Sequence, residues 1–220
     1  MQNLIVIDGL DGSGKATQAG ILVERLKSQG KNVRKVSFPD YDSQSSALVK
    51  MYLAGEFGTH PGDVNAYAAS SFYAVDRYAS FKKDWAKDWE TGTIIADRYT
   101  TSNAIHQCSK LPESQWPIFL HWLFDYEYRL LGIPAPNKVI YLRMDPAVSQ
   151  KLLEKRYGDM ADAKKDLHEK DIEYMLRCHE AAAYCARVLG WETIECCENG
   201  AVRTKDDIAK DILDIVTTNI

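Results

Sequence analysis

The residues best suited to chemistry lie in one short run near the start of the chain. In Gly9-Leu10-Asp11-Gly12-Ser13-Gly14-Lys15-Ala16-Thr17, two glycines and a lysine follow the G-x-x-x-x-G-K spacing of a phosphate-binding loop. Such a loop turns its backbone N–H groups onto phosphate oxygens, and the helix that follows adds the positive end of its dipole. We therefore expect this run to bind the phosphates of a nucleotide, with the lysine reaching the outer phosphates.

The residue after the lysine is Ala16, where the motif usually carries a serine or threonine hydroxyl that binds Mg²⁺. A magnesium ion here would therefore depend on phosphate oxygens, water and carboxylates. The alternative interpretation is an ordinary glycine-rich turn with a solvated lysine. The flanking pattern, an apolar run before the loop and a helical pattern after it, favours the phosphate-binding loop.

A second set of charges follows another apolar run, at Asp97 and Arg98. Because the carboxyl ends of parallel strands share one edge of a sheet, we expect both to lie beside Asp8 and Asp11. The planar fork of an arginine suits a phosphate group. The alternative here is an ion pair at the end of a strand.

Tyr73 and Arg77 lie four residues apart in a helical pattern and therefore share a helix face. A ring and a guanidinium on one face suit a stacked base with a hydrogen-bonded edge, or a nearby phosphate. Aromatic residues at this spacing are also typical of a hydrophobic core, so that both interpretations stand.

The elements that must position these groups alternate along the chain. Apolar runs predict strands at Leu4–Asp8, Thr93–Asp97 and Lys138–Met144, and two segments that are more polar, Val33–Phe38 and Trp191–Cys196, are expected to add two strands. Helical periodicity predicts helices near Thr17–Ser28, Ser46–Gly55, Asp63–Glu90, Glu113–Leu131, Pro146–Lys155, Glu169–Gly190 and Lys205–Thr217. This order predicts an α/β fold, with a parallel sheet of about five strands covered by helices on both faces. We expect one domain over residues 1–220, with an exposed, mobile, charge-dense excursion over Glu154–Lys170.

Composition narrows the class of protein. The 220 residues carry 27 basic and 31 acidic side chains, a net charge of −4, and 45% are hydrophobic. This excludes a disordered chain and argues against nucleic acid as a partner. Neither a membrane-spanning segment nor a signal peptide is expected. The five cysteines form no C-x-x-C pair, which argues against a disulfide framework or zinc ribbon and favours the cytoplasm.

Taken together, these motifs resemble those of the thymidylate kinase family. The resemblance rests on GLDGSGKAT, Phe38-Pro39, YAVDR at Tyr73–Arg77, DRYTTSNA at Asp97–Ala104, and a D-x-x-E pattern at Asp166 and Glu169. It implies a three-layer P-loop kinase fold and transfer of the γ-phosphate of ATP to dTMP, with Mg²⁺. It also implies a homodimer.

The resemblance assigns roles around the transferred phosphate. Lys15 and the loop amides would hold the phosphates of ATP, and Asp11 would approach the sugar and phosphate of the acceptor. Arg98 would bridge the acceptor phosphate and the transferring group. Asp97 would order Arg98 and bind the metal through water. Arg156 would close over the phosphates from a lid near residues 151–168.

On the acceptor side, the resemblance implies a pocket for dTMP. Tyr73 would stack on thymine, where the family usually has phenylalanine, and Arg77 would meet the edge of the base. The other implied pocket residues are Phe38, Ser102, Asn103 and His106.

Two positions depart from the family pattern. His106 stands where many members have a tyrosine that crowds the 2′ position of the sugar. Asp40 and Tyr41 follow Phe38-Pro39, where the family often has an arginine that holds the acceptor. Two alternatives therefore remain: a kinase for another acceptor, such as dUMP or another pyrimidine monophosphate, and a nucleotide-binding regulatory module with little turnover.

Overall fold

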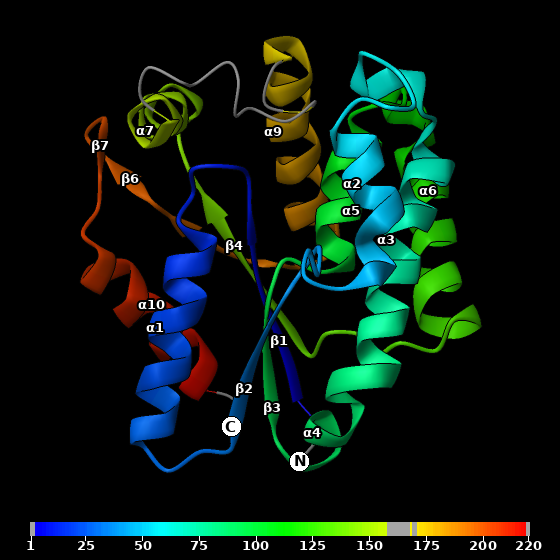
Figure 1. Cartoon of the computed structure of the whole chain (residues 1–220). Coiled ribbons are helices and arrows are strands. Elements are labelled where there is room, and N and C mark those ends of the chain that lie inside the picture. The colour runs from blue at the N-terminus through cyan, green and yellow to red at the C-terminus, as the bar shows by residue number, and fades with distance from the viewer. Residues whose placement is uncertain (1–2, 158–167, 169–170, 219–220) are drawn as a thin grey trace.

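A five-stranded parallel sheet forms the centre of the molecule, as a computed structural model of residues 3–157, 168 and 171–218 shows (Figure 1). The strands are β1 (Asn3–Gly9), β2 (Val33–Ser37), β3 (Thr93–Asp97), β4 (Lys138–Arg143) and β5 (Glu192–Glu195). They lie in the order β2-β3-β1-β4-β5, and every adjacent pair is parallel. The carboxyl ends of all five therefore meet at one edge, where α/β proteins bind ligands.

Helices cover both faces of this sheet (Figure 1). The α-helices are α1 (Lys15–Ser28), α2 (Ala47–Leu53), α3 (Ala66–Ser80), α4 (Ala86–Thr91), α5 (Thr100–Cys108), α6 (Trp116–Phe124), α7 (Pro146–Tyr157), α9 (Ile172–Val188) and α10 (Lys205–Thr217). Short 3₁₀ turns occupy η1 (Gln44–Ser46), η2 (Pro61–Asp63) and η4 (Glu113–Gln115), and π-helical segments occupy η3 (Phe81–Trp85) and η5 (Asp125–Leu130). Helices α1 and α10 lie together on one face, and α3, α5 and α9 lie on the other.

The central strand β1 is buried on both faces. Ile5 and Ile7 pack with α1 and α10, whereas Leu4 and Val6 pack toward Trp85 on the opposite face. Because alternate side chains of a strand point to opposite sides, a strand covered by two helical layers must be apolar at every position. The uninterrupted apolar run in the sequence therefore predicted this strand correctly, and the predicted α/β class is confirmed.

Two predicted helices are interrupted. The segment predicted as one helix over Asp63–Glu90 is divided into η2, α3, η3 and α4, and the one over Glu113–Leu131 into η4, α6 and η5. A π-helical segment changes the hydrogen-bond pattern without changing the residue types that build it. Periodicity alone therefore cannot locate it.

Two elements have no counterpart among the predictions. Helix α5 is built largely from residues with weak intrinsic helix preference, in the run Thr100-Thr101-Ser102-Asn103, and burial against β1, α3 and α9 stabilises it. A hairpin of β6 (Cys197–Glu198) and β7 (Ala201–Val202) turns at Asn199-Gly200, both with positive φ. The Asn-Gly pair is a strong hairpin signal that the sequence did contain.

The described helices include none that is both long and apolar enough to cross a membrane. The cysteines are free thiols, four of them buried and Cys197 half-buried.

Candidate active site

The phosphate-binding loop joins β1 to α1 at the carboxyl edge of the sheet. At Gly9, φ is 156°, and a Cβ atom would approach the Leu142 carbonyl oxygen to 2.7 Å. At Gly12, φ is 80°, and a Cβ atom would lie 2.7 Å from Ser149 Oγ. The Ser149 hydroxyl, from α7, donates a hydrogen bond to the backbone carbonyl of Asp11. Glycine is therefore required at both positions by backbone conformation and by close approach.

The N-terminus of α1 has the features of an anion-binding site. Gly14 is its N-cap, with no side-chain hydrogen bond to the first turn, and this turn carries no acidic residue. The buried hydroxyl of Ser13 has no hydrogen-bond partner within the described part of the chain. Free N–H groups, a helix dipole and a buried hydroxyl together fit phosphate oxygens.

Lys15 is held within the loop. Only 7% of the residue is exposed, and its Nζ donates to the Leu10 carbonyl oxygen at 2.8 Å and lies 3.8 Å from Asp11 Oδ1. Burial, together with the nearby positive charge of Arg98, lowers the pKa of Lys15 to about 8. The ammonium is therefore poorly solvated, and it would gain from a bound polyanion.

Arg98 faces the loop from the end of β3. Its φ of 66° is unusual for a residue with a side chain, and its backbone N–H donates to the Ile7 carbonyl oxygen at 3.1 Å. Its guanidinium donates to Asp11 Oδ1 and, at 3.4 Å, to Ser102 Oγ. Burial would lower the pKa of Arg98, but the carboxylates of Asp11 and Asp8 outweigh it and raise that pKa above its usual value. The guanidinium is therefore a fixed cation within the site.

The carboxylate of Asp8 ties this edge of the sheet to α5. It accepts hydrogen bonds from the Gly9 backbone N–H at 2.7 Å, from Ser102 Oγ at 2.9 Å and from Thr101 Oγ1. The same serine contacts Arg98, so that Asp8 also positions Arg98 indirectly.

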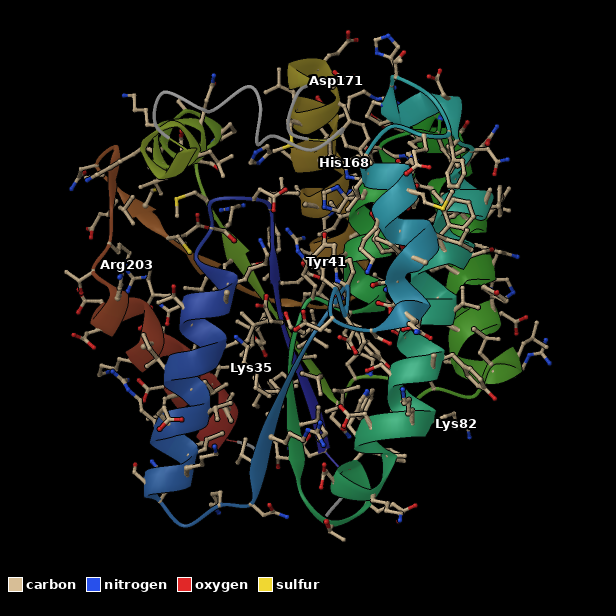
Figure 2. The ribbon with its side chains drawn as sticks, viewed as in Figure 1. Lys35, Tyr41, Lys82, His168, Asp171 and Arg203 are labelled. Carbon is tan, nitrogen blue, oxygen red and sulfur yellow. The ribbon has the colours of Figure 1, made fainter. Side chains whose placement is uncertain are left out.

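Asp97 ends β3 with a buried carboxylate. Its Oδ2 lies 3.4 Å from Ser37 Oγ and 3.7 Å from Lys35 Nζ, and Lys35 also donates to the Ala16 carbonyl oxygen at 3.1 Å. Figure 2 shows Lys35 extending from β2 toward α1. Carboxylate and hydroxyl oxygens are ligands that suit Mg²⁺, directly or through water, so that the donors at this corner fit the ion.

These groups surround one cleft of about 610 Å³. Its lining consists of Asp11, Gly12, Gly14, Lys15, Ala16, Thr17, Ser37, Phe38, Pro39, Tyr41, Asp97, Arg98, Leu152 and Leu153. The structure therefore brings most of the predicted loop together with the predicted Asp97 and Arg98.

Comparison with known proteins identifies the family of this chain. The family model for thymidylate kinase matches residues 7–192. The thymidylate kinase of Mycobacterium tuberculosis is 30% identical over 193 residues, which cover 86% of this chain and 87% of that protein. The chain belongs to the thymidylate kinase family. The thymidylate kinase of Schizosaccharomyces pombe is 25% identical over 214 residues, covering 97% of this chain and 91% of the relative.

A solved structure supports the fold of this family member. The structure of thymidylate kinase from Candida albicans superposes with a TM-score of 0.73 at 21% identity, covering 99% of this chain and 92% of that one. The predicted P-loop kinase fold is therefore confirmed. The family match also confirms the predicted enzyme class and reaction, phosphorylation of dTMP by a kinase, and favours neither alternative.

The predicted acceptor residues of this kinase occupy two environments. Phe38 lines the cleft and lies 5.7 Å from the Tyr99 ring, between centroids. Tyr73, Arg77 and Asn103 lie on α3 and α5, outside that lining. The structure therefore does not bring every predicted acceptor residue into one described cleft, and their roles stay predictions.

His106 lies deeper, on α5. Its ring stacks on that of His168 with 5.5 Å between centroids and an interplanar angle of 16°, and Tyr174 donates to its backbone carbonyl oxygen at 2.9 Å. Burial and the positive charge of Arg98 lower the pKa of His106 to about 3. The imidazole is therefore neutral at physiological pH.

The predicted lid is described only in part. Lys151 and Lys155 lie on α7 and are exposed. Arg156 belongs to the same helix, but its side chain lies outside the described residues, as do Asp166 and Glu169. The predicted closure over the phosphates by Arg156 stays a prediction.

Several site residues have no counterpart among the sequence predictions. Tyr41, Leu152 and Leu153 line the cleft, and Ser149 braces the loop, without any motif to mark them. Lys35 could have been predicted from the sequence. Because side chains alternate along a strand, Lys35 lies on the same side of β2 as Ser37, which is next to Asp97.

Proposed function

We propose that the protein uses ATP as the phosphate donor for dTMP, and that Lys15 and Arg98 together hold the phosphates between which the group moves. The observation that carries this assignment is that both cations contact one carboxylate oxygen, Asp11 Oδ1, at the wall of one cleft. Lys15 stands at the start of α1, on the donor side, and Arg98 at the end of β3. Asp11 keeps the two cations in place until phosphates replace part of its contacts.

Transfer of a phosphoryl group from ATP to dTMP requires little covalent chemistry from the protein itself. The acceptor phosphate is already ionised at neutral pH, so that it attacks without a strong general base. The main barrier is the approach of two polyanions and the negative charge spread over the transferring group. Lys15, the loop N–H groups and the forked guanidinium of Arg98 would reduce that repulsion, and closure of the site would exclude the water that hydrolyses ATP.

Magnesium belongs to the same proposal. Asp97 would hold the ion through water, with Ser37 beside it, and Ala16 leaves its other positions to phosphate oxygens and water. When bound, the ion would neutralise phosphate charge and orient the chain of phosphates.

The test is a panel of acceptors. The purified protein is incubated with ATP and Mg²⁺, and with dTMP, dUMP or their ribonucleotide counterparts, while ADP release is followed. We expect ADP release that depends on dTMP and exceeds that with the other acceptors. Release that prefers dUMP or a ribonucleotide would instead favour the alternative acceptor. ATP binding with no acceptor-dependent ADP would favour a regulatory module.

The pKa of Lys15 predicts an alkaline limit. The cationic form is the one that binds phosphate, and it is present below its pKa of about 8 and lost above it. We expect kcat/KM for ATP to fall above about pH 8, since this parameter reports the free enzyme. kcat should hold to higher pH, because bound phosphates favour the cation. Rate profiles from pH 6.5 to 9.5 measure both.

The control for this pH dependence is Lys15→Arg, which keeps a positive charge throughout the range. Its kcat/KM for ATP should be lower but nearly flat at alkaline pH. An alkaline limb identical to that of the wild type would assign the titration to another group.

We propose further that the protein is a homodimer in the cytoplasm, with residues 1–220 acting as one domain. Val75 and Tyr78 on α3 and Ile118 on α6 are exposed hydrophobic residues, which suits a partner subunit. Free thiols fit a reducing compartment. Analytical ultracentrifugation would measure the oligomeric state.

A further inference from the structure

Glu127 lies at the centre of a buried polar cluster that joins three helical segments. It is completely buried on η5, and its carboxylate accepts hydrogen bonds from α3 and α5. Arg77 donates through Nε at 2.7 Å and also through Nη2. Thr100 Oγ1 donates at 2.8 Å and Asn103 Nδ2 at 3.3 Å. We call these four residues the Glu127 cluster.

The buried ion pair between Arg77 and Glu127 is not expected to add much to the stability of the fold. Burying an ion pair costs desolvation free energy that the attraction between its members often only balances. Burial alone would lower the pKa of Arg77, but Glu127 outweighs it and raises that pKa, so that the guanidinium stays charged. The carboxylate also lies in a π-helical segment, a distortion frequently found at functional sites.

The pairing leaves part of Arg77 for another partner. Glu127 is contacted by Nε and Nη2, while the Tyr99 ring centroid lies 6.0 Å from Arg77 Cζ. These contacts fix the plane of the guanidinium, and the Nη1 arm is not used by the carboxylate. Nη1 is therefore a hydrogen-bond donor held in one direction.

The same carboxylate orients the amide of Asn103. Asn103 Nδ2 donates to Glu127 Oε1 and, at 3.2 Å, to the Ser70 carbonyl oxygen. If the amide were turned over, its oxygen would face both of these acceptors, which repel it. Glu127 and the Ser70 carbonyl oxygen together therefore turn Asn103 Oδ1 away from themselves and leave it as an acceptor.

We propose that Glu127 is a positioning residue for the acceptor base, and that it sets which pyrimidine is accepted by fixing a donor on Arg77 beside an acceptor on Asn103. This inference rests on the proposed function and on the role that the family resemblance implies for Arg77, at the edge of the base. Thymine and uracil present an acceptor at O4 beside an N–H donor at N3, whereas cytosine presents a donor at N4 beside an acceptor at N3. The fixed pair matches the first edge and opposes the second.

The test is Glu127→Gln. The neutral side chain would place an amide N–H against the Arg77 guanidinium, and it would weaken one of the two acceptors that orient Asn103, leaving the Ser70 carbonyl oxygen. With dTMP and dCMP as acceptors, we expect the ratio of their kcat/KM values to fall by about tenfold or more, the scale of losing a hydrogen bond to a charged group. KM for dTMP should rise, while KM for ATP and kcat should stay within about twofold.

The ratio is chosen because it does not depend on how much of the variant is folded. Both acceptors are measured on the same preparation, so that a loss of folded protein cancels. Glu127→Asp provides a second variant, since it keeps the charge but withdraws the carboxylate by one methylene. We expect its ratio to lie between those of the wild type and Glu127→Gln.

The matched control is Glu195→Gln, which removes the same charge from an exposed pair with Arg143. It should leave every parameter unchanged. A dTMP to dCMP ratio in Glu127→Gln equal to that of an active wild type would overturn the positioning role alone. Wild-type protein that shows no dTMP-dependent ADP release would overturn the proposed function, and this inference with it.

Discussion

Lys15→Ala is expected to lower kcat by a factor of about 10² or more, because one group that stabilises charge in the transition state commonly contributes that much. The ammonium is the cation that the loop itself carries, and it is already buried beside Leu10 and Asp11. Its removal would leave the phosphates with the loop N–H groups alone on that side. Initial rates at saturating ATP and dTMP measure the effect.

The matched control is Lys27→Ala, at the other end of the same helix, where the side chain is exposed. It removes an equal charge from α1 and should leave kcat within about twofold. ATP binding by Lys15→Ala, followed by calorimetry, separates a loss of affinity from a loss of turnover. Nearly normal kcat in Lys15→Ala would remove Lys15 from the mechanism.

The sequence predicted the sheet well because the sheet is the part of the fold under the simplest constraint. Every strand covered on both faces must be apolar at each position, as Leu4, Val6 and Ile7 illustrate. The breaks in the helices were not predictable in the same way. At η5, no residue between Asp125 and Leu130 is a glycine or proline that would mark a break, so that the π-helical segment is visible only in the structure.

The same contrast between local pattern and tertiary packing holds for the residues of the candidate site. The phosphate-binding loop and the pair Asp97-Arg98 were predictable because each consists of adjacent residues directly after an apolar strand pattern. The Glu127 cluster combines residues 77, 100, 103 and 127, and no spacing connects a carboxylate in one predicted helix to an arginine in another. Tertiary packing alone brings these residues together, and local patterns carry no information about it.

The burial of Arg77 shows what helical spacing alone leaves out. Its helical spacing from Tyr73 suggested a side chain presented on a helix face to a ligand. In the structure, only 2% of Arg77 is exposed, and two of its nitrogens contact Glu127. Arg77 is therefore held as a unit with Glu127, and any role it has must be considered together with that partner.

Arg98→Ala is the second substitution with a large expected effect, a loss of about 10² or more in kcat. Arg98 is held by Asp11 and by Ser102, which is itself held by Asp8, so that its direction is fixed before any phosphate arrives. A group fixed in advance needs no reorganisation when charge develops, and its removal therefore affects turnover more than binding. Rates at saturating dTMP test this, with KM for dTMP changing less than kcat.

Arg98→Lys tests whether charge or geometry is responsible. A lysine keeps the positive charge at the end of β3 but lacks the fork that lets one side chain contact two groups at once. Its kcat should therefore remain well below that of the wild type. The control is Arg25→Ala, which removes a charge from the surface pair with Asp206 and should leave turnover unchanged. If Arg98→Lys were as active as the wild type, charge alone would account for the role of Arg98, and the hydrogen bonds to Asp11 and Ser102 would have no part in catalysis.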